Sequence, residues 1–318
     1  MMRKWVLTVC AVGWWSAVSA QQAVWQPSAG YVQVPIWPGK PPDSRPFTAP
    51  ETVATEVKSL VAGKPWTYIN NVSQPTMTVY SPTGKNTGAA VIVFPGGGYE
   101  ILAIDLEGTE ACDWLVSRGI TCVLLKYRVP APRSAPYFGA YPQSPMALED
   151  AQRTIGLVRF HAAEWHIDPR KIGVLGFSAG GHLVAATSVH FDQRLYSEAD
   201  PADQQSCRPD FAIAIYPGHL SMSAGSLELN PDIAAHITAQ TPPTFLLQNE
   251  DDNADSIWDS LAYYAALKKV GVPVEFHSYA EGGHAFGLRR TEYPVTAWTQ
   301  LLEVWLRTIG ITADQPGA

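Results

Sequence analysis

Residues 176–180 read Gly-Phe-Ser-Ala-Gly and set one serine hydroxyl between small neighbours. The apolar run 171–175 precedes them, and small residues typical of a helix start follow. In a sharp turn from strand to helix, this spacing holds the serine clear of the sheet, and glycines avoid collisions with the neighbouring backbone. We therefore predict that Ser178 is a nucleophile and that the Ala179 amide faces a developing oxyanion. The alternative is a glycine-rich turn with an exposed serine.

A serine hydroxyl is a weak nucleophile at neutral pH, so it needs a base. His284 directly follows the last expected strand, 274–279, in a Gly-Gly-His sequence. The two glycines allow the loop to bring the ring over the sheet edge. His219 is the alternative base, but it precedes the acidic segment, whereas the usual chain order is serine, acid, histidine.

An acidic loop follows the expected strand 244–247 and should supply the carboxylate that orients the imidazole. Residues 248–255 contain four acids. We favour Asp251 as the acid, with Asp252 second and Asp255 third. The other acids are expected to be solvated, with Asp255 capping the helix that follows.

A second glycine cluster, residues 96–98, follows the apolar run 89–94. Consecutive glycines let backbone N–H groups approach a ligand without interfering side chains. We expect Gly97 and Gly98 to join Ala179 as oxyanion donors. A phosphate-binding loop does not fit, because no Gly-Lys-Ser/Thr follows and no G-x-G-x-x-G opens a helix.

Short apolar segments alternate with helical stretches along the chain. This alternation predicts an α/β fold with an open, mostly parallel sheet and right-handed crossovers. Chemistry in such a sheet collects at the carboxyl ends of the strands, where the residues above would meet. The expected strands are 76–80 at the sheet edge, 89–94, 121–125, 171–175, 211–216, 244–247 and 274–279. The expected helices are 107–118, 144 (Ser144 as N-cap) to about 165, 179–190, 256–270 and 294–309.

The N-terminal residues are expected to precede the catalytic domain, which we place at 66–318. Residues 1–20 have a basic head, an apolar stretch and small residues before a cleavage point after Ala20, the pattern of a secretory signal peptide. An uncleaved anchor is the alternative, although the stretch is short for a membrane span. Residues 21–65 are rich in proline and predict an extended arm lying on the domain, or a disordered tether. We therefore expect a secreted or periplasmic protein.

Three cysteines, Cys112, Cys122 and Cys207, remain after that cleavage. Cys112 in an expected helix and Cys122 in an expected strand are interpreted as small buried apolar residues. One disulfide is possible in an oxidising compartment, but the sequence does not assign it. No CxxC pair or His/Cys cluster has zinc spacing.

The composition limits the class of partner. The chain has 318 residues, 46% of them hydrophobic, which excludes a mainly disordered protein. Its formal net charge of −7 disfavours a nucleic-acid partner, because a polyanion would be repelled. A neutral small molecule fits this balance.

Taken together, the motifs resemble those of secreted bacterial α/β-hydrolase esterases. More narrowly they are similar to acetyl-xylan and feruloyl esterases, related to the hormone-sensitive-lipase-like group, over about residues 66–310. Two departures are Pro95, where such enzymes carry His, and Ala254, where valine is common. The motifs are Pro-Gly-Gly-Gly-Tyr at 95–99, Lys-Tyr-Arg-Val-Pro at 126–130, Gly-Phe-Ser-Ala-Gly-Gly-His at 176–182, Asp-Asp at 251–252 and Gly-Gly-His-Ala-Phe at 282–286.

The resemblance implies an α/β-hydrolase fold with Ser178 as nucleophile, His284 as base and Asp251 as acid. It implies a serine carboxylesterase that hydrolyses acyl esters of carbohydrate such as xylan, acetyl esters first, with no metal or organic cofactor. A feruloyl or general short-chain esterase is the alternative, then a serine peptidase, then a binding protein without activity. The expected partner is an acylated carbohydrate or another small ester, with no nucleic acid and no stable membrane insertion. Loop residues expected near the substrate, with ordinary packing as the alternative for the aromatic ones, are Tyr99, Glu100, Arg128, Tyr137, Phe138 and Tyr216.

Overall fold

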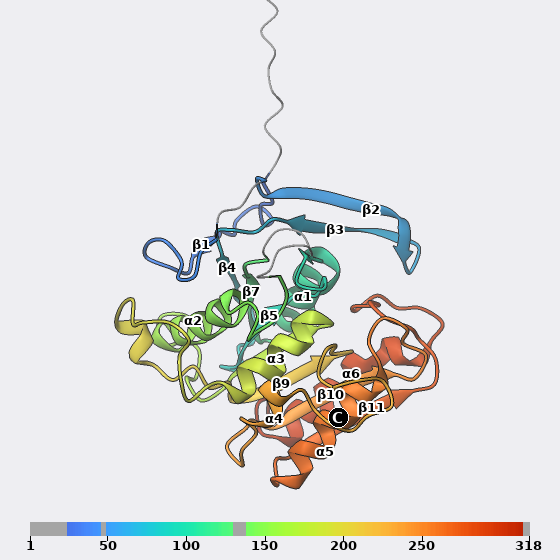
Figure 1. Cartoon of the computed structure of the whole chain (residues 1–318). Coiled ribbons are helices and arrows are strands. Elements are labelled where there is room, and N and C mark those ends of the chain that lie inside the picture. Colours follow the sequence, from blue (N-terminus) through green and yellow to red (C-terminus); the bar gives the residue numbers. More distant parts are fainter. Residues whose placement is uncertain (1–23, 46–48, 130–137, 314–318) are drawn as a thin grey trace, which may run out of the picture.

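A mostly parallel β-sheet carries the fold in this computed structural model, which describes residues 24–45, 49–129 and 138–313. Within these ranges the sheet has eight strands, in the order β1-β4-β7-β5-β8-β9-β10-β11 (Figure 1). In this sheet order, neighbouring strands from β7 to β11 pair in parallel, whereas β4 pairs antiparallel with both β1 and β7. The predicted α/β class is therefore confirmed. The bounds are β1 Val34–Pro35, β4 Thr76–Tyr80, β5 Ala90–Phe94, β7 Thr121–Lys126, β8 Ile172–Phe177, β9 Phe211–Ile215, β10 Thr244–Asn249 and β11 Val274–Tyr279.

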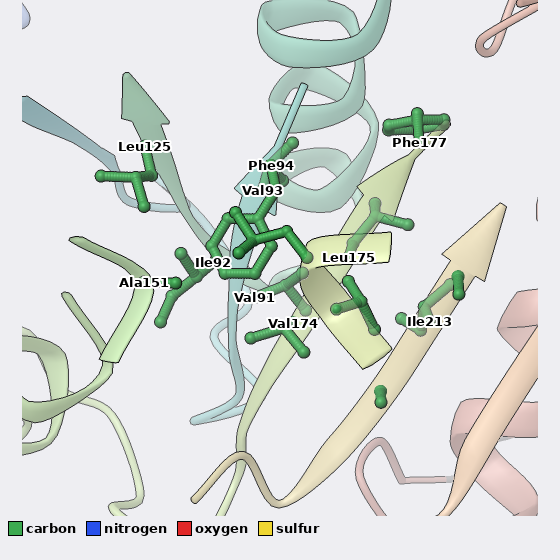
Figure 2. Packing of buried hydrophobic residues seen from close by; sticks show 14 of the residues in the cluster. Val91, Ile92, Val93, Phe94, Leu125, Ala151, Val174, Leu175, Phe177 and Ile213 are labelled. Atoms are coloured by element: carbon green, nitrogen blue, oxygen red, sulfur yellow. The ribbon is translucent and has the colours of Figure 1, made fainter. Parts of the chain in front are cut away.

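The sheet's central strands form the core. Every residue of β5, β7, β8, β9 and β10 is buried, as expected for apolar strands covered on both faces. Figure 2 shows Ile92, Val174 and Ile213 among the side chains that fill this region. The core therefore holds the carboxyl ends of these strands in fixed positions, which is where the loops of interest begin.

Six α-helices lie in the described ranges: α1 Glu110–Ser117, α2 Met146–Phe160, α3 Ala179–Val189, α4 Pro231–Ala234, α5 Ile257–Lys269 and α6 Trp298–Thr308. A π-helical turn η1, Asp105–Thr109, precedes α1, and short 3₁₀ turns lie at Pro201–Gln204 and Pro294–Ala297. The predicted cap of α2 is wrong. Pro145 precedes the first helical residue, and the buried hydroxyl of Ser144 has no hydrogen-bond partner among the described residues. The expected extent of α2 is also too long, since it ends at Phe160.

The end of the expected N-terminal arm is a β-hairpin instead. β2 (Thr52–Val61) and β3 (Lys64–Asn70) pair around Ala62 and Gly63, both at positive φ, and lie across the top of the molecule in Figure 1. β3 also pairs with β6 (Ile101–Leu102), which follows the 96–98 glycine cluster. The arm prediction missed this hairpin because its alternation is weak, and it is tied to a loop distant in sequence.

Residues 24–45 do lie on the domain. β1, from this segment, pairs with β4 and so becomes the edge strand in place of β4. Trp37 is buried, and its indole Nε1 donates a 2.8 Å hydrogen bond to Asp150 of α2. The expected signal peptide, residues 1–20, lies outside the described residues. No helix within the described ranges is both long and apolar enough to span a bilayer.

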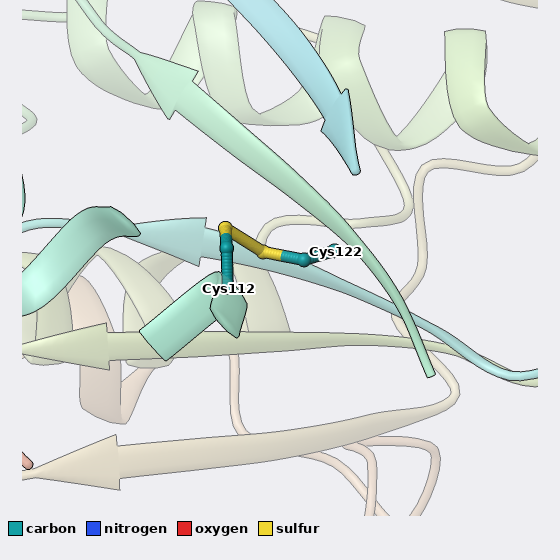
Figure 3. Close-up of a disulfide and its surroundings, with 2 residues drawn as sticks. All are labelled: Cys112 and Cys122. Atoms are coloured by element: carbon teal, nitrogen blue, oxygen red, sulfur yellow. A yellow bond between two sulfur atoms is a disulfide. The ribbon is translucent and has the colours of Figure 1, made fainter. Parts of the chain in front are cut away.

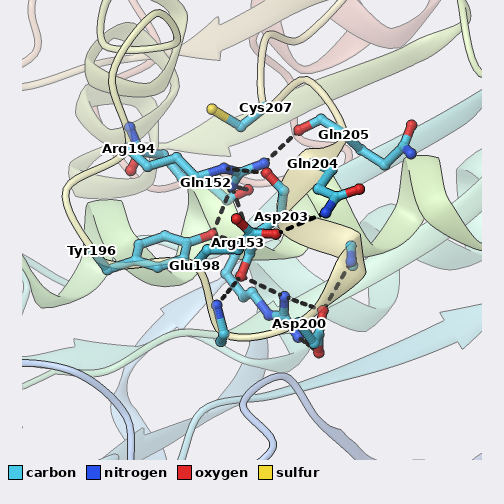
Figure 4. A network of polar contacts seen from close by, with 12 residues as sticks. Gln152, Arg153, Arg194, Tyr196, Glu198, Asp200, Asp203, Gln204, Gln205 and Cys207 are labelled. Atoms are coloured by element: carbon cyan, nitrogen blue, oxygen red, sulfur yellow. Dashed lines mark hydrogen bonds and ion pairs between the residues drawn. The ribbon is translucent and has the colours of Figure 1, made fainter.

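Two sets of contacts join elements around the sheet. Cys112 of α1 and Cys122 of β7 form a disulfide, the pairing that the sequence left open (Figure 3). Cys207 is a free buried thiol. In a separate polar network, Arg153 of α2 forms ion pairs with Asp200 and Asp203 (Figure 4). This network fixes the segment after α3 against α2.

Candidate active site

A strained turn presents Ser178 at the end of β8. The residue has φ 53° and ψ −120°, and α3 begins at the next residue. A Cβ on Gly176 would overlap the carbonyl of Gly180, and a Cβ on Gly180 would overlap the carbonyl of Phe94. Glycine at these positions therefore has the steric role predicted from the sequence, and the strain is of the kind stored at functional sites.

His284 contacts the Ser178 hydroxyl. Its Nε2 lies 3.0 Å from Ser178 Oγ, and its Nδ1 lies 2.7 Å from Asp252 Oδ2. Gly282 and Gly283, both at positive φ, shape the loop that carries it. The alternative base, His219, makes no hydrogen bond to Ser178 within the described ranges; it lines a cavity together with Asp255, and its ring centroid lies 6.3 Å from that of His182. A serine, an imidazole and a carboxylate thus form one chain of hydrogen bonds.

The favoured acid, Asp251, does not contact the histidine; Asp252 does. Asp252 Oδ1 accepts bonds of 3.0 Å from the amides of Ala254 and Asp255, and this local turn leaves Oδ2 facing His284. Asp251 instead accepts hydrogen bonds from the amides of Gly282 and Gly283, at 3.1 and 2.8 Å. Asp251 therefore holds the loop that carries the histidine, and Asp252, the second choice from the sequence, is the carboxylate that contacts the imidazole.

Asp255 is a second carboxylate at the same imidazole. Its Oδ2 lies 3.3 Å from Ser178 Oγ and 3.7 Å from His284 Nε2. The expected helix cap is wrong, because Ser256 accepts the capping bond from the Trp258 amide. Asp252 and Asp255 of the acidic loop are therefore folded into the site, whereas Asp251 and Glu250 are exposed, as expected for Glu250.

The charges around His284 favour its protonated form. Burial by itself lowers the pKa of His284, but the hydrogen bond and charge of Asp252, followed by the charges of Asp255 and Glu107, raise that pKa above its usual value. Burial raises the pKa of Asp255, and the positive charge of His284 opposes this. The two carboxylates thus stabilise the imidazolium that forms when the serine loses its proton.

The 95–99 loop offers backbone donors beside the serine. Gly97 and Gly98 have φ 131° and 63°, and their amides have no acceptor among the described residues. Ala179 is the first residue of α3, so its amide has no acceptor within the helix. That Gly97, Gly98 and Ala179 bind an oxyanion stays a prediction, and nothing in this geometry opposes it.

Glu107 takes the place of the missing histidine as support for this loop. Its Oε2 accepts a 2.8 Å bond from the Gly96 amide, and its Oε1 accepts a 2.8 Å bond from the hydroxyl of Tyr216. Tyr127 donates a further bond to the carbonyl of Pro95. Burial raises the pKa of Glu107. The sequence shows this residue only as an acid near a helix start, which gives no sign of its position under the loop.

Three of the expected substrate contacts are buried against protein groups, and their predicted role is wrong. Tyr99 is 2% exposed and bonds to His182 Nδ1 at 2.8 Å. Arg128 is fully buried and pairs with Glu149 and Asp150, because burial of a charged group requires partners. Tyr216 is also fully buried, and its ring centroid lies 4.7 Å from that of His284.

The remaining expected contacts are less constrained. Glu100 is half-buried in the turn after Gly98, where its amide bonds to the carbonyl of Gly97. Its substrate role stays a prediction. Phe138 is half-buried, and Tyr137 lies outside the described residues.

Two cavities lie near the site, one lined by Ser178 and His284 and the other lined by Asp255. A mainly apolar one of about 350 Å³ includes hairpin residues that sequence reasoning missed. A polar one of about 220 Å³ is shared by the loops after β9 and β10. The apolar cavity is lined by Ser59, Leu60, Val61, Trp66, Gly97, Ile101, Ala103, Leu106, Glu107, Ser178, His284 and Ala285. The polar cavity is lined by His219, Ser221, Ser223, Ala224, Ala254, Asp255, Ser256 and Asp259.

Known proteins are similar to this chain in sequence and in fold. The family described as BD-FAE matches residues 77–217, and the prolyl oligopeptidase family matches residues 227–310. A crystal structure of an acetyl ester-xyloside bifunctional hydrolase from Caldicellulosiruptor lactoaceticus is 32% identical, with a TM-score of 0.69. The alignment covers 89% of this chain and 97% of that protein.

Two curated relatives are longer proteins. An acetylxylan esterase of Xylanibacter ruminicola is 27% identical over 248 residues, which is 70% of this chain and 46% of that protein. The endo-1,4-beta-xylanase B of Butyrivibrio fibrisolvens is 28% identical over 234 residues, which is 69% of this chain and 36% of that protein. The chain thus spans less than half the length of either.

Proposed function

The chain belongs to the α/β-hydrolase-fold carbohydrate esterases, which are serine hydrolases of carboxylic esters, and from this membership we propose that it removes acetyl groups from acylated xylan-type carbohydrate. One observation carries the proposal: Ser178 Oγ lies 3.0 Å from His284 Nε2 while Asp252 lies 2.7 Å from Nδ1. The relatives named for acetylxylan and acetyl ester-xyloside hydrolysis support the choice of substrate.

The geometry supports a two-step acyl transfer. His284 takes the proton of Ser178 Oγ, the oxygen attacks the ester carbonyl carbon, and Asp252 stabilises the imidazolium. The amides of Gly97, Gly98 and Ala179 are the proposed donors to the tetrahedral oxyanion, at about 3 kcal/mol each in comparable sites. His284 then protonates the departing alcohol. Water, activated by the same nitrogen, hydrolyses the acyl-enzyme and restores the serine.

Feruloyl esters are the second candidate substrate. The apolar cavity extends from Ser178 to Leu60, Val61 and Trp66 of the hairpin, and its lining favours an apolar acyl group. An acyl group larger than acetyl would bury more of this surface.

The test measures acid release from acetylated and feruloylated xylo-oligosaccharides by the purified chain. We expect the wild-type chain to release acetate and Ser178→Ala to release none. The control Ser197→Ala, which removes an exposed serine from the loop after α3, should keep the activity. Faster release of ferulate would assign the second candidate instead. Turnover of prolyl or alanyl p-nitroanilides in preference to every ester would contradict esterase function, as would failure of a fluorophosphonate to label Ser178.

We also propose that the chain is exported and cleaved after Ala20. The basic head and apolar stretch of residues 1–20 support this, and the Cys112–Cys122 disulfide suits an oxidising compartment. N-terminal sequencing of the protein exported by a bacterial host should begin at Gln21. An uncleaved chain retained in the membrane would contradict it.

A further inference from the structure

Asp255 is a carboxylate beside the nucleophile to which the acyl-transfer mechanism assigns no contact with the substrate. Its side chain is only 12% exposed, and its Oδ2 lies 3.3 Å from Ser178 Oγ. The backbone around it is fixed, because its amide donates to Asp252 and its carbonyl accepts from Gln248. Gly218 makes room for it, since a Cβ there would overlap the carboxylate. The fold therefore fixes the position of Asp255 beside Ser178.

The position of Asp255 places it on the alcohol side of the substrate. The leaving oxygen must lie within hydrogen-bond reach of His284 Nε2, because this nitrogen protonates it. Asp255 Oδ2 lies 3.7 Å from that nitrogen. The proposed oxyanion donors Gly97 and Gly98 belong to the loop that borders the apolar cavity. An alcohol leaving past His284 thus meets Asp255 and the polar cavity beyond it, lined also by Ser221 and Asp259.

The Ser178 hydroxyl cannot serve Asp255 as a hydrogen-bond donor during the reaction. Ser178 Oγ lies 3.3 Å from Asp255 Oδ2, but its single proton passes to His284 during the attack. The imidazolium then offsets the charge of Asp255, although its Nε2, 3.7 Å from Oδ2, is beyond hydrogen-bond distance. A donor supplied by the substrate would satisfy this largely buried acceptor. A simple alkyl alcohol has no such group, whereas a sugar carries a hydroxyl on the carbon next to the esterified one.

We propose that Asp255 binds the hydroxyl adjacent to the ester-bearing carbon, so that the site selects esters of vicinal diols over esters of simple alcohols. This inference rests on the proposed function, because it names the part of the carbohydrate that the esterase recognises. Asp255 accepts the hydroxyl proton in a charge-assisted hydrogen bond, and the polar cavity receives the rest of the alcohol.

A matched pair of small esters tests this inference directly. 2-Hydroxyethyl acetate presents the adjacent hydroxyl, and 2-methoxyethyl acetate replaces its proton by a methyl group. We expect the wild-type chain to prefer the first by roughly tenfold or more in kcat/KM, as in sites built around a substrate hydroxyl. Asp255→Ala should reduce that ratio to about one, and Asp255→Asn should give an intermediate ratio. Glu250→Gln, which removes an exposed acid from the same loop, should keep the wild-type ratio.

Equal kcat/KM values for the two esters in the wild type would overturn the inference, and so would an unchanged preference in Asp255→Ala. If the variants do not fold, the ratio of kcat/KM for the two esters in the wild type is sufficient to test the inference. Failure of the proposed function looks different. A chain that prefers 2-hydroxyethyl acetate yet releases no acid from acylated xylo-oligosaccharides would contradict the carbohydrate substrate while supporting the role of Asp255.

Discussion

At the scale of single residues, one imidazole lies between two carboxylates with different tasks. Asp252 contacts Nδ1 of His284, on the side remote from the serine, and accepts four hydrogen bonds in all. Asp255 lies on the Nε2 side, next to the reacting oxygen. The neighbouring Asp251 contacts neither nitrogen and instead accepts hydrogen bonds from amides of the loop that carries His284. Each of these assignments can be tested by a single substitution.

Asp252→Asn should lower kcat for p-nitrophenyl acetate by about 10³- to 10⁴-fold, since an amide no longer fixes the tautomer or stabilises the imidazolium. Asp251→Asn keeps an acceptor for the loop amides and should lower kcat less than about tenfold. Thermal unfolding of both variants checks that they are folded. A larger loss in Asp251→Asn than in Asp252→Asn would return the role of acid to Asp251.

Asp255→Asn should move the acid limb of the kcat/KM profile to lower pH. The base must be neutral to act, so kcat/KM rises with pH through the pKa of His284. The charge of Asp255 helps to raise that pKa, and its removal lowers it. The profile is measured with p-nitrophenyl acetate, whose alcohol has no adjacent hydroxyl. Glu250→Gln should leave the midpoint of the profile unchanged. An unchanged midpoint in Asp255→Asn would show that the charge of Asp255 does not affect the pKa of His284.

At the scale of elements, the glycine loop depends on parts of the chain that flank it. β6 ties the loop to the β2–β3 hairpin, and the π-helical turn η1 carries Glu107 back beneath Gly96. Such π-helical segments are often found at functional sites. Tyr216, after β9, links Glu107 to His284 through its hydroxyl and ring. Glu107 is therefore a positioning residue for both the proposed oxyanion donors and the base.

Glu107→Ala should lower kcat by about 100-fold, comparable to the loss of one oxyanion donor, and destabilise the fold by about 1–3 kcal/mol, because two buried donors lose their acceptor. Glu107→Gln keeps one acceptor and should recover part of both losses. Glu110→Gln, at the start of the adjacent helix α1, weakens an ion pair to Arg289 and is the control for stability alone. Affinity for a boronic acid that mimics the tetrahedral state separates the two roles. It should fall in parallel with kcat for Glu107→Ala and stay unchanged for Glu110→Gln.

At the scale of the whole molecule, a buried ion network attaches the N-terminal segment to the domain. Arg128, after β7, pairs with Glu149 and Asp150 of α2, and it donates to the carbonyl of Pro42. Two carboxylates thus share one guanidinium, and Asp43, next to Pro42, lies close to Glu149.

This network predicts a loss of stability as the pH rises toward about 8. Burial, and then the hydrogen bond with Asp43, raise the pKa of Glu149 to about 8, against the opposing charge of Arg128. A pKa raised in the folded state favours folding below the unfolded value and loses that contribution as pH rises through about 8. The free energy of unfolding in urea should therefore fall as the pH rises from the unfolded pKa of 4.5 to about 8, and level off above it. Glu149→Gln, which mimics the protonated acid, should flatten this slope. An equally steep slope in that variant would place the titrating group elsewhere.

The sequence by itself determined the parts of this protein that depend on neighbouring residues. A strand, a turn between two glycines and a helix must place Ser178 at the sheet edge, because the steric limits act within five residues. The order serine, acid, histidine and the position of His284 follow from strands read off their apolar runs. The α/β class and six of the parallel strands could be predicted for the same reason.

Only the tertiary structure decided what depends on contacts between distant segments. Asp251 and Asp252 are adjacent and chemically identical, and the choice between them depends on which side of the turn faces the histidine loop. Glu107 and Trp66 reach the site from elements with no sequence signal for it, and the Cys112–Cys122 pairing depends on how α1 packs on β7. Arg128 was expected near the substrate, but it is buried and forms ion pairs with Glu149 and Asp150. Side-chain direction and long-range packing set these outcomes, and neither is encoded in local spacing.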